Sequence, residues 1–211
     1  MSGERYAPVL PASDPATIRR AAELLRAGGL VVFPTDTVYG IAASVERPDA
    51  VARIYVAKAR PLDRAIPVLV SDIAQVTRLT RGVTPSISRL LAAYWPGALT
   101  VVLRAADWLP VEVTAGAGTV GLRMPDHPTA LAIIAGAGGA VATTSANRSG
   151  QADARSASEA LAALGHAVDL IVDGGPSPGG VPSTVIAIED GRVRVLRRGA
   201  IDPSALPETL D

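Results

Sequence analysis

The 211-residue sequence contains no cysteine, a single lysine, a single phenylalanine and only two histidines. The absence of cysteine excludes disulfide bonds, thiolate zinc sites and cysteine nucleophiles. His127 precedes the proline that begins a predicted helix, and His166 lies in a predicted loop. A serine triad, a histidine phosphocarrier or a histidine metal site would need better placed imidazoles, so the sequence predicts no protein-bound metal.

Long hydrophobic runs and an excess of charge are also missing. The longest apolar candidate, residues 129–143, is interrupted by three glycines and is too short to span a membrane. Residues 1–15 lack a basic region followed by an apolar stretch, which predicts no signal peptide and therefore a cytoplasmic protein without a membrane partner. Twenty basic and twenty acidic residues balance, which disfavours strong nonspecific attraction to nucleic acid.

Hydrophobic residues make up 48% of the chain, enough for a buried core, and aromatic residues only 3%. Short apolar runs alternate with helical patterns, and the runs outnumber the helices between them. This pattern predicts a single α/β domain over residues 1–211, with a core at about 15–200 and a twisted, mixed β-sheet covered by helices. Helices are expected at 15–27, 48–57, 73–79, 85–94, 128–135 and 157–164, and strands at 30–33, 67–70, 99–103, 119–123, 140–143, 170–172, 183–188 and 192–196.

Lys58 is the one lysine among 19 arginines, in the segment Lys58-Ala-Arg60-Pro61. A GC-rich genome would explain the arginine bias without any functional meaning. Pro61 ends the preceding helix, and cations at a helix C-terminus also interact favourably with the helix dipole. The functional alternative is that Lys58 and Arg60 converge on phosphate oxygens, the lysine as a compact point charge and the arginine as a planar fork.

Polar segments adjoin several of the predicted strands, where sites of α/β proteins gather. Residues 34–40 read PTDTVYG, and residues 143–147 place hydroxyls and an amide at alternate positions. Each segment alone is equally compatible with an ordinary turn whose side chains satisfy local backbone groups. The sequence lacks G-x-x-x-x-G-K-[ST] and lacks a G-x-G-x-x-G that opens a helix, so neither common phosphate-binding loop is present.

Seven segments in order resemble the YrdC-like family of threonylcarbamoyl-AMP synthases. They are PTDTVYG (34–40), KARP (58–61), WPGALT (95–100), TVGLRMP (119–125), TSAN (144–147), STVI (183–186) and RRG (197–199). Each is unspecific alone, but their shared order runs from about residue 30 to 199. Because the sequence stops at Asp211, it resembles the short form of the family, which has no C-terminal extension.

The resemblance implies a nucleotidyltransferase that forms threonylcarbamoyl-AMP and pyrophosphate from L-threonine, bicarbonate and ATP. A downstream tRNA-modification protein would transfer the threonylcarbamoyl group to an adenosine of tRNA. Attack on the α-phosphate requires positioning and charge stabilisation more than a general base, which suits a chain without a well-placed histidine. ATP is a substrate in this reaction, and Mg²⁺ would assist at its phosphates.

The resemblance also implies roles for particular residues. Lys58 and Arg60 would be catalytic. ATP would be bound by Lys58, Arg60, Arg64, Thr119, Ser145, Asn147 and Arg197, and threonine by Thr37, Arg123, Thr143 and Ser183. Three positions depart from the family pattern: Leu69 replaces a histidine near threonine, Asp153 replaces a serine near the nucleotide, and Arg64 replaces an asparagine.

Two alternatives remain open from the sequence. A paralogue could share the fold and the nucleotide site but use a different acceptor, which the substitutions at Leu69 and Asp153 permit. A noncatalytic module could instead bind double-stranded RNA or tRNA weakly, through arginines gathered on one face. Dispersed arginines would leave that second alternative without support.

Overall fold

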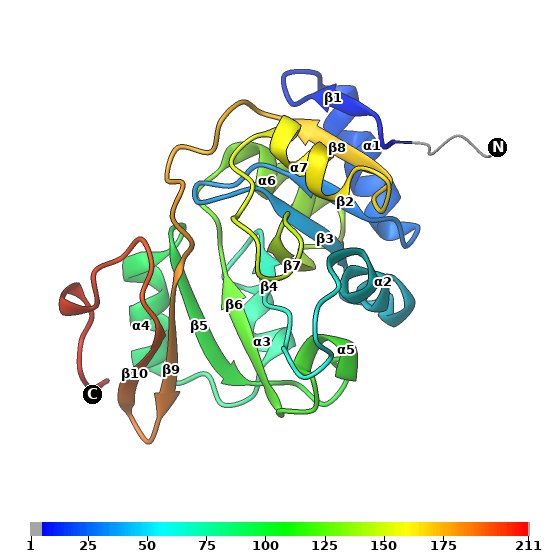
Figure 1. Ribbon diagram of the computed structural model, residues 1–211. Helices are drawn as coiled ribbons and strands as arrows, with labels where there is room; N and C mark the ends of the chain where they lie inside the picture. Colours follow the sequence, from blue (N-terminus) through cyan, green and yellow to red (C-terminus); the bar gives the residue numbers. More distant parts are fainter. Residues whose placement is uncertain (1–5, 211) are drawn as a thin grey trace.

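The computed structural model describes residues 6–210, and ten strands form one sheet in the order β1-β8-β2-β3-β7-β4-β6-β5-β9-β10 (Figure 1). Residues 1–5, on which the signal-peptide prediction partly rests, and residue 211 lie outside the described residues. The strands are β1 (Val9–Pro11), β2 (Val31–Phe33), β3 (Gly40–Ser44), β4 (Val68–Val70), β5 (Leu99–Arg104), β6 (Thr119–Arg123), β7 (Ala140–Ser145), β8 (Leu170–Asp173), β9 (Thr184–Glu189) and β10 (Arg192–Arg197).

The strand pairing is mixed, as the sequence predicts. β8 pairs in parallel with β1 and β2, β4 with β6, and β5 with β9, whereas the other five neighbouring pairs are antiparallel. Figure 1 shows the resulting twist: β8 and β2 run across the picture, whereas β5 and β9 run from top to bottom. The right-handed twist of each strand accumulates over ten strands and produces this change of direction.

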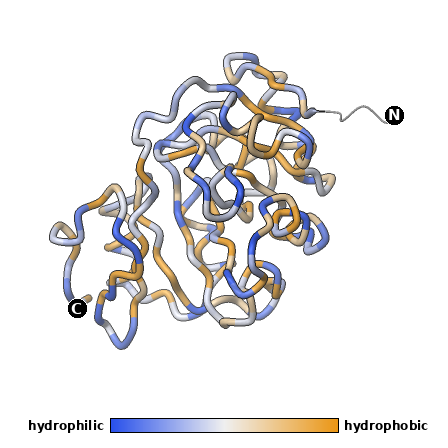
Figure 2. The backbone as a smooth tube through the Cα atoms, in the orientation of Figure 1, coloured by the Kyte–Doolittle hydropathy of each residue, from blue (hydrophilic) through white to orange (hydrophobic). Residues whose placement is uncertain are grey.

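Helices cover both faces of the sheet. Successive strand residues contribute to opposite cores: Val31 and Phe33 pack under α1 and α6, while Val32 packs under the other helices. The hydropathy of the chain follows the same arrangement, with apolar segments inside and hydrophilic ones in the loops (Figure 2). The helices are α1 (Pro15–Arg26), α2 (Pro48–Lys58), α3 (Gln75–Leu79), α4 (Pro85–Tyr94), α5 (Val111–Thr114), α6 (Pro128–Gly136) and α7 (Ala157–Leu164), followed by a 3₁₀ turn at Pro203–Ala205.

Every predicted helix and strand is present, but two strands, one short helix and the 3₁₀ turn are missing from the prediction. β3 is buried on both faces, and four of its five residues, GIAAS, are small, so it shows neither the alternation nor the bulk of a typical strand. β1 and α5 have three and four residues, too few for a periodic pattern. No helix within residues 6–210 is long and apolar enough to cross a membrane.

The start of α1 illustrates how local sequence sets the boundary of an element. Asp14 is the N-cap, and its side chain accepts a hydrogen bond from Ala16 N at 2.8 Å, with Pro15 as the first helical residue. We expect Asp14→Ala to lower the free energy of unfolding by about 1 kcal/mol, measured by urea denaturation. The control Glu23→Ala, at an exposed position inside α1, should change it by less than about 0.5 kcal/mol. Equal effects would contradict the capping role.

Candidate active site

A cavity of about 140 Å³ lies where several of the polar segments meet. The turn after β2, the strand β4, the starts of β5 and β9, and the ends of β6, β7 and β10 all reach it. Its walls are rich in hydroxyls and carry one buried and one exposed arginine. The lining residues are Thr35, Thr37, Val38, Tyr39, Gly40, Pro67, Leu69, Thr100, Arg123, Thr143, Thr144, Ser145, Asp153, Pro182, Ser183, Val185 and Arg197.

Arg123 is the buried cation of this cavity, with 5% of its surface exposed. Its guanidinium donates to the carbonyl oxygen of Gly97 (2.9 Å) and to Thr37 Oγ1 (2.8 Å), and forms an ion pair with Asp36. Burial lowers the pKa of Arg123 and Asp36 opposes that effect, so the guanidinium stays charged. An arginine has five N–H donors, and these contacts leave donors for an anionic ligand.

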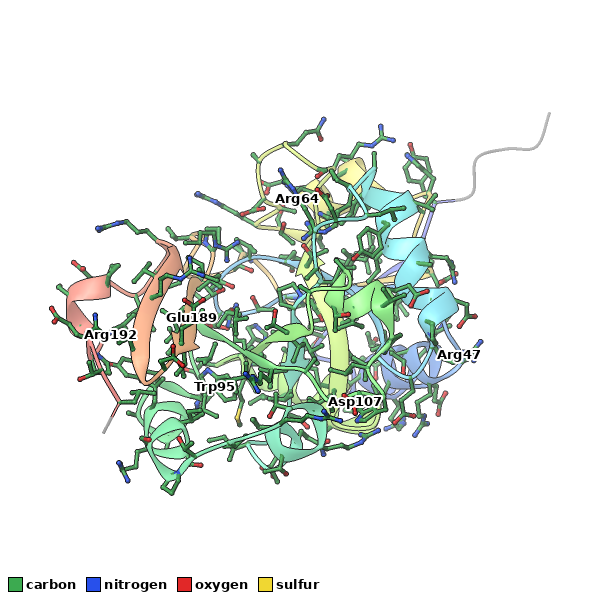
Figure 3. All side chains as sticks on the ribbon, turned by 90° about the horizontal axis from the view of Figure 1, so that it is seen from below. Arg47, Arg64, Trp95, Asp107, Glu189 and Arg192 are labelled. Atoms are coloured by element: carbon green, nitrogen blue, oxygen red, sulfur yellow. The ribbon has the colours of Figure 1, made fainter. Side chains whose placement is uncertain are left out.

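The WPG segment orients the carbonyl group that Arg123 uses. The Trp95–Pro96 peptide bond is cis, and Trp95 Nε1 donates to the carbonyl oxygen of Leu99 at 2.8 Å. Gly97 N donates to the carbonyl oxygen of Met124 at 2.8 Å, next to Arg123 in the chain. Figure 3 shows Trp95 in the interior of the molecule. Residues 95–97 therefore support Arg123 and do not line the cavity, whereas Thr100 of the same motif does.

Arg197 and Ser183 form another part of the cavity wall. Arg197 Nη2 donates to the carbonyl oxygen of Ser183 at 2.8 Å, and the hydroxyls of Ser183 and Thr100 are hydrogen-bonded at 2.8 Å. Desolvation lowers the pKa of Arg197, and the carboxylate of Asp153 acts in the opposite direction. Thr100 is absent from the predicted site, although it lies inside the WPGALT motif, which was the available signal.

Lys58 lies behind the turn that follows β7, and it does not line the cavity. It is 2% exposed, and its ammonium donates to Ser145 O (2.5 Å), to Asn147 O and to Asn147 Oδ1 (3.0 Å). Ser145 does line the cavity, whereas Asn147 is buried beside the lysine. The helix that ends at Lys58 thus places its only lysine against the backbone of the TSAN segment.

The other predicted nucleotide ligands are distributed unevenly. Arg60 donates to the carbonyl oxygens of Arg64 (3.1 Å) and Ala65 (2.8 Å), which folds the segment after α2 back on itself. Arg64 is exposed. Thr119 begins β6 while Arg123 ends it, and Thr119 lines a second depression beside Arg104. The structure therefore brings Ser145 and Arg197 to the cavity, but not Arg60, Arg64 or Thr119.

All four predicted threonine ligands line the cavity: Thr37, Arg123, Thr143 and Ser183. Gly40 contributes by having no side chain, because a Cβ atom there would lie 2.7 Å from Thr143 Cγ2. Leu69 forms an apolar part of the wall beside Arg123, its register partner on β6.

The loop after β8 packs against the PTDTVYG turn. Gly179 N and Gly180 N donate to the carbonyl oxygens of Asp36 (3.0 Å) and Thr37 (2.8 Å), and Tyr39 Oη donates to Gly175 O at 2.7 Å. A Cβ atom on Gly179 would lie 2.5 Å from the Asp36 carbonyl oxygen, so the close approach requires glycine. These contacts hold the turn at Thr37, which forms one side of the cavity.

The exposed arginines are dispersed over the described surface. Figure 3 shows Arg47, Arg64 and Arg192 at separate places. Several pair with nearby carboxylates, including Arg47 with Asp49 and Arg194 with Glu189. Among residues 6–210, no group of three or more His, Asp or Glu residues could hold a metal ion. Within residues 6–210, these arginines therefore lend no support to the RNA-binding alternative.

The fold and the cavity define a mixed-sheet α/β protein with a buried arginine in a cavity walled by hydroxyls. The family model Sua5_yciO_yrdC, described as "Telomere recombination", matches residues 23–199. The chain belongs to this family, which confirms the resemblance seen in the sequence.

Three relatives illustrate the similarity. The chain is 44% identical over 193 residues to the threonylcarbamoyl-AMP synthase of Bacillus subtilis, covering 91% of this chain and 56% of that protein. It is 38% identical over 186 residues to a putative threonylcarbamoyl-AMP synthase of Mycobacterium tuberculosis, covering 88% and 85%. The crystal structure of Sua5 from P. abyssi with L-threonine matches with a TM-score of 0.84 and 37% identity, covering 86% of this chain and 54% of that one.

The chain spans only about half the length of two of these relatives.

Proposed function

We propose that this protein is an L-threonylcarbamoyladenylate synthase, which forms threonylcarbamoyl-AMP and pyrophosphate from L-threonine, bicarbonate and ATP. The observation that carries the proposal is the buried Arg123 guanidinium, which lines a small cavity walled by hydroxyls together with Arg197. The relatives named as synthases and the threonine complex of a similar protein support the same assignment. The product would be used in the cytoplasm by a tRNA-modification protein.

In this proposal the free donors of Arg123 bind the threonine carboxylate as a charge-assisted pair. Thr37, Thr143 and Ser183 offer hydroxyls to the rest of the amino acid, and all three line the cavity. Bicarbonate and the threonine amine form a carbamate with loss of water. A carbamate oxygen then attacks the α-phosphorus of ATP while the bond to pyrophosphate breaks. Arg197 and the segment at Ser145 lie where they can stabilise charge on the phosphates.

The residues present also fit Mg²⁺ bound together with ATP. Magnesium in phosphate sites is held by one or two carboxylates together with phosphate oxygens. Asp153 lines the cavity and forms none of the described ion pairs, so it is the carboxylate that would hold the ion. The ion would neutralise charge on the phosphate oxygens, and Asp153 would then assist nucleotide binding instead of repelling it.

The proposal predicts that pyrophosphate release requires ATP, bicarbonate and threonine together. Omitting any one should reduce release to background, as measured by a coupled pyrophosphate assay. Serine, valine and the other amino acids serve as controls, because the apolar Leu69 wall bears directly on the choice of amino acid. Release that does not depend on threonine and bicarbonate would refute the synthase assignment. Release that depends on another amino acid would establish the paralogue instead.

A further inference from the structure

The ammonium group of Lys58 has no donor left for a ligand. A protonated lysine carries three N–H donors and no acceptor. The structure supplies three acceptors, Ser145 O at 2.5 Å, Asn147 O, and Asn147 Oδ1 at 3.0 Å. The side chain is 2% exposed, so water does not compete for these bonds. A fourth partner would have to displace one of the three.

These three bonds belong to a wider hydrogen-bond network around residues 145–151. Asn147 Oδ1 also accepts from Ser145 Oγ at 2.6 Å, and Asn147 Nδ2 donates to the carbonyl oxygen of Gln151 at 2.6 Å. Ser149 N donates to the carbonyl oxygen of Lys58 at 2.9 Å. The turn of residues 145–151 is therefore hydrogen-bonded to the C-terminus of α2 through both the ammonium and the carbonyl oxygen of Lys58. Ser145, at the start of this turn, is the member that lines the cavity.

The geometry also explains why lysine occupies this position in a chain that otherwise uses arginine. Three acceptors gathered around one nitrogen suit the tetrahedral donors of an ammonium, whereas a planar guanidinium directs its donors outward in a fork. An arginine would place a larger head group where Ser145 and Asn147 already close around the nitrogen.

We propose that Lys58 is a positioning residue, whose ammonium holds the 145–151 turn in the shape that binds nucleotide, and that it does not contact the phosphates. The inference rests on the proposed function only for the identity of the nucleotide. It replaces the expectation from the sequence that Lys58 is itself a phosphate ligand.

The pH dependence follows from the same contacts. Burial is the main cause that lowers the pKa of Lys58 to about 8, Arg60 acts in the same direction, and Asp153 opposes both. Above this pH the neutral amine has two N–H groups for three acceptors, so one bond to the turn is lost. Nucleotide affinity should therefore fall as the pH rises from 7 to 9.

Global stability should follow the opposite trend. Because the folded-state pKa lies below the unfolded value of 10.5, the unfolded chain binds more protons between pH 8 and 10.5. The contribution of Lys58 to the free energy of unfolding therefore rises with pH across that window. Loss of affinity without a matching loss of stability separates positioning from a general structural role.

The first experiment requires no nucleotide. In ¹⁵N NMR spectra of the wild-type protein, the backbone amides of residues 145–151 should shift with a common midpoint near pH 8, and in Lys58→Met this titration should vanish. As the chain has a single lysine, ¹⁵N-lysine labelling gives one side-chain signal for the same midpoint. Amides that do not respond between pH 7 and 9 would overturn the positioning role, whatever reaction the protein catalyses.

The second experiment is a double-mutant cycle on ATP affinity with Lys58→Met and Asn147→Leu. If the lysine acts through the turn, each single variant and the double variant should weaken ATP binding to a similar extent, at least 10-fold. If the fold-losses of ATP affinity in the two single variants multiply in the double variant, the two side chains contact the nucleotide separately, which would overturn the proposal. Threonine affinity, measured in parallel, should stay within about 2-fold of wild type, because Arg123 and Thr37 are outside this network.

The wild-type protein alone decides the question if a variant fails to fold. Its ATP affinity should fall at least 3-fold between pH 7 and 9, and unchanged affinity would overturn the proposal. The outcomes also separate the two claims. ATP binding that depends on the turn, without threonine-dependent pyrophosphate release, would refute the synthase and leave the positioning role intact.

Discussion

Replacement of Arg123 by methionine is expected to abolish threonine-dependent pyrophosphate release and to lower the free energy of unfolding by about 3–5 kcal/mol. The arginine and Asp36 form an ion pair whose side chains are 7% and 15% exposed. Removing only the guanidinium leaves a nearly buried carboxylate without its counter-charge, which costs more than loss of the bond itself. Urea denaturation and the coupled pyrophosphate assay measure the two effects separately.

Two companion variants show which property of Arg123 matters. Arg123→Lys keeps the charge but not the planar fork, so we expect the threonine KM to rise by at least about 10-fold. The double variant Asp36→Asn with Arg123→Met removes both charges and should recover part of the lost stability, but no activity. If Arg123→Met unfolds at the same urea concentration as the wild type, the ion pair contributes nothing and our account of the site is wrong.

Replacement of Gly199 by alanine should lower kcat/KM by about 100-fold and the free energy of unfolding by about 1–3 kcal/mol. A Cβ atom at this position would lie 2.4 Å from the carbonyl oxygens of Pro182 and Ser183. Both neighbours are backbone atoms, so no side-chain rotation relieves the overlap. The shift must move Ser183, which contacts Thr100 and Arg197 in the cavity wall.

Gly82→Ala is the matched control for this variant. Gly82 has a φ of +73° and no atom within 4 Å of the added Cβ, so alanine there costs backbone strain of about 1–2 kcal/mol without an overlap. We expect pyrophosphate release by Gly82→Ala to equal that of the wild type. Equal losses of activity in the two variants would show that lower stability, and not displacement of Ser183, explains the effect of Gly199→Ala.

Local signals predicted the secondary structure well wherever a cap or a period marks an element. Residues 85–94 and 157–164 form helices with the expected bounds, because Thr84 and Ser156 cap them and their apolar faces repeat at helical spacing. β3 was not predicted, because four of its five residues are small and all five are buried, so its hydrophobic pattern carries no period. Its place between β2 and β7 depends on pairing with residues more than 90 positions away.

The residue types of the candidate site were predictable from motif order, but their arrangement was not. Thr119 and Arg123 share one motif, yet a strand advances roughly 3.3 Å per residue, so they lie at opposite ends of β6. Thr100 was overlooked because its partner, Ser183, is 83 residues further along the chain. Asp36 is the partner of Arg123 only because β2 and β6 end near the same cavity.

The sequence by itself determined the α/β class, the family and the polar segments that surround the cavity, because composition, caps and motif order are local properties. It also singled out Lys58, as the one lysine among 19 arginines. Only the tertiary structure decided what that lysine contacts. Its acceptors on Ser145 and Asn147 belong to a segment almost 90 residues away, which β-sheet pairing brings to the end of α2.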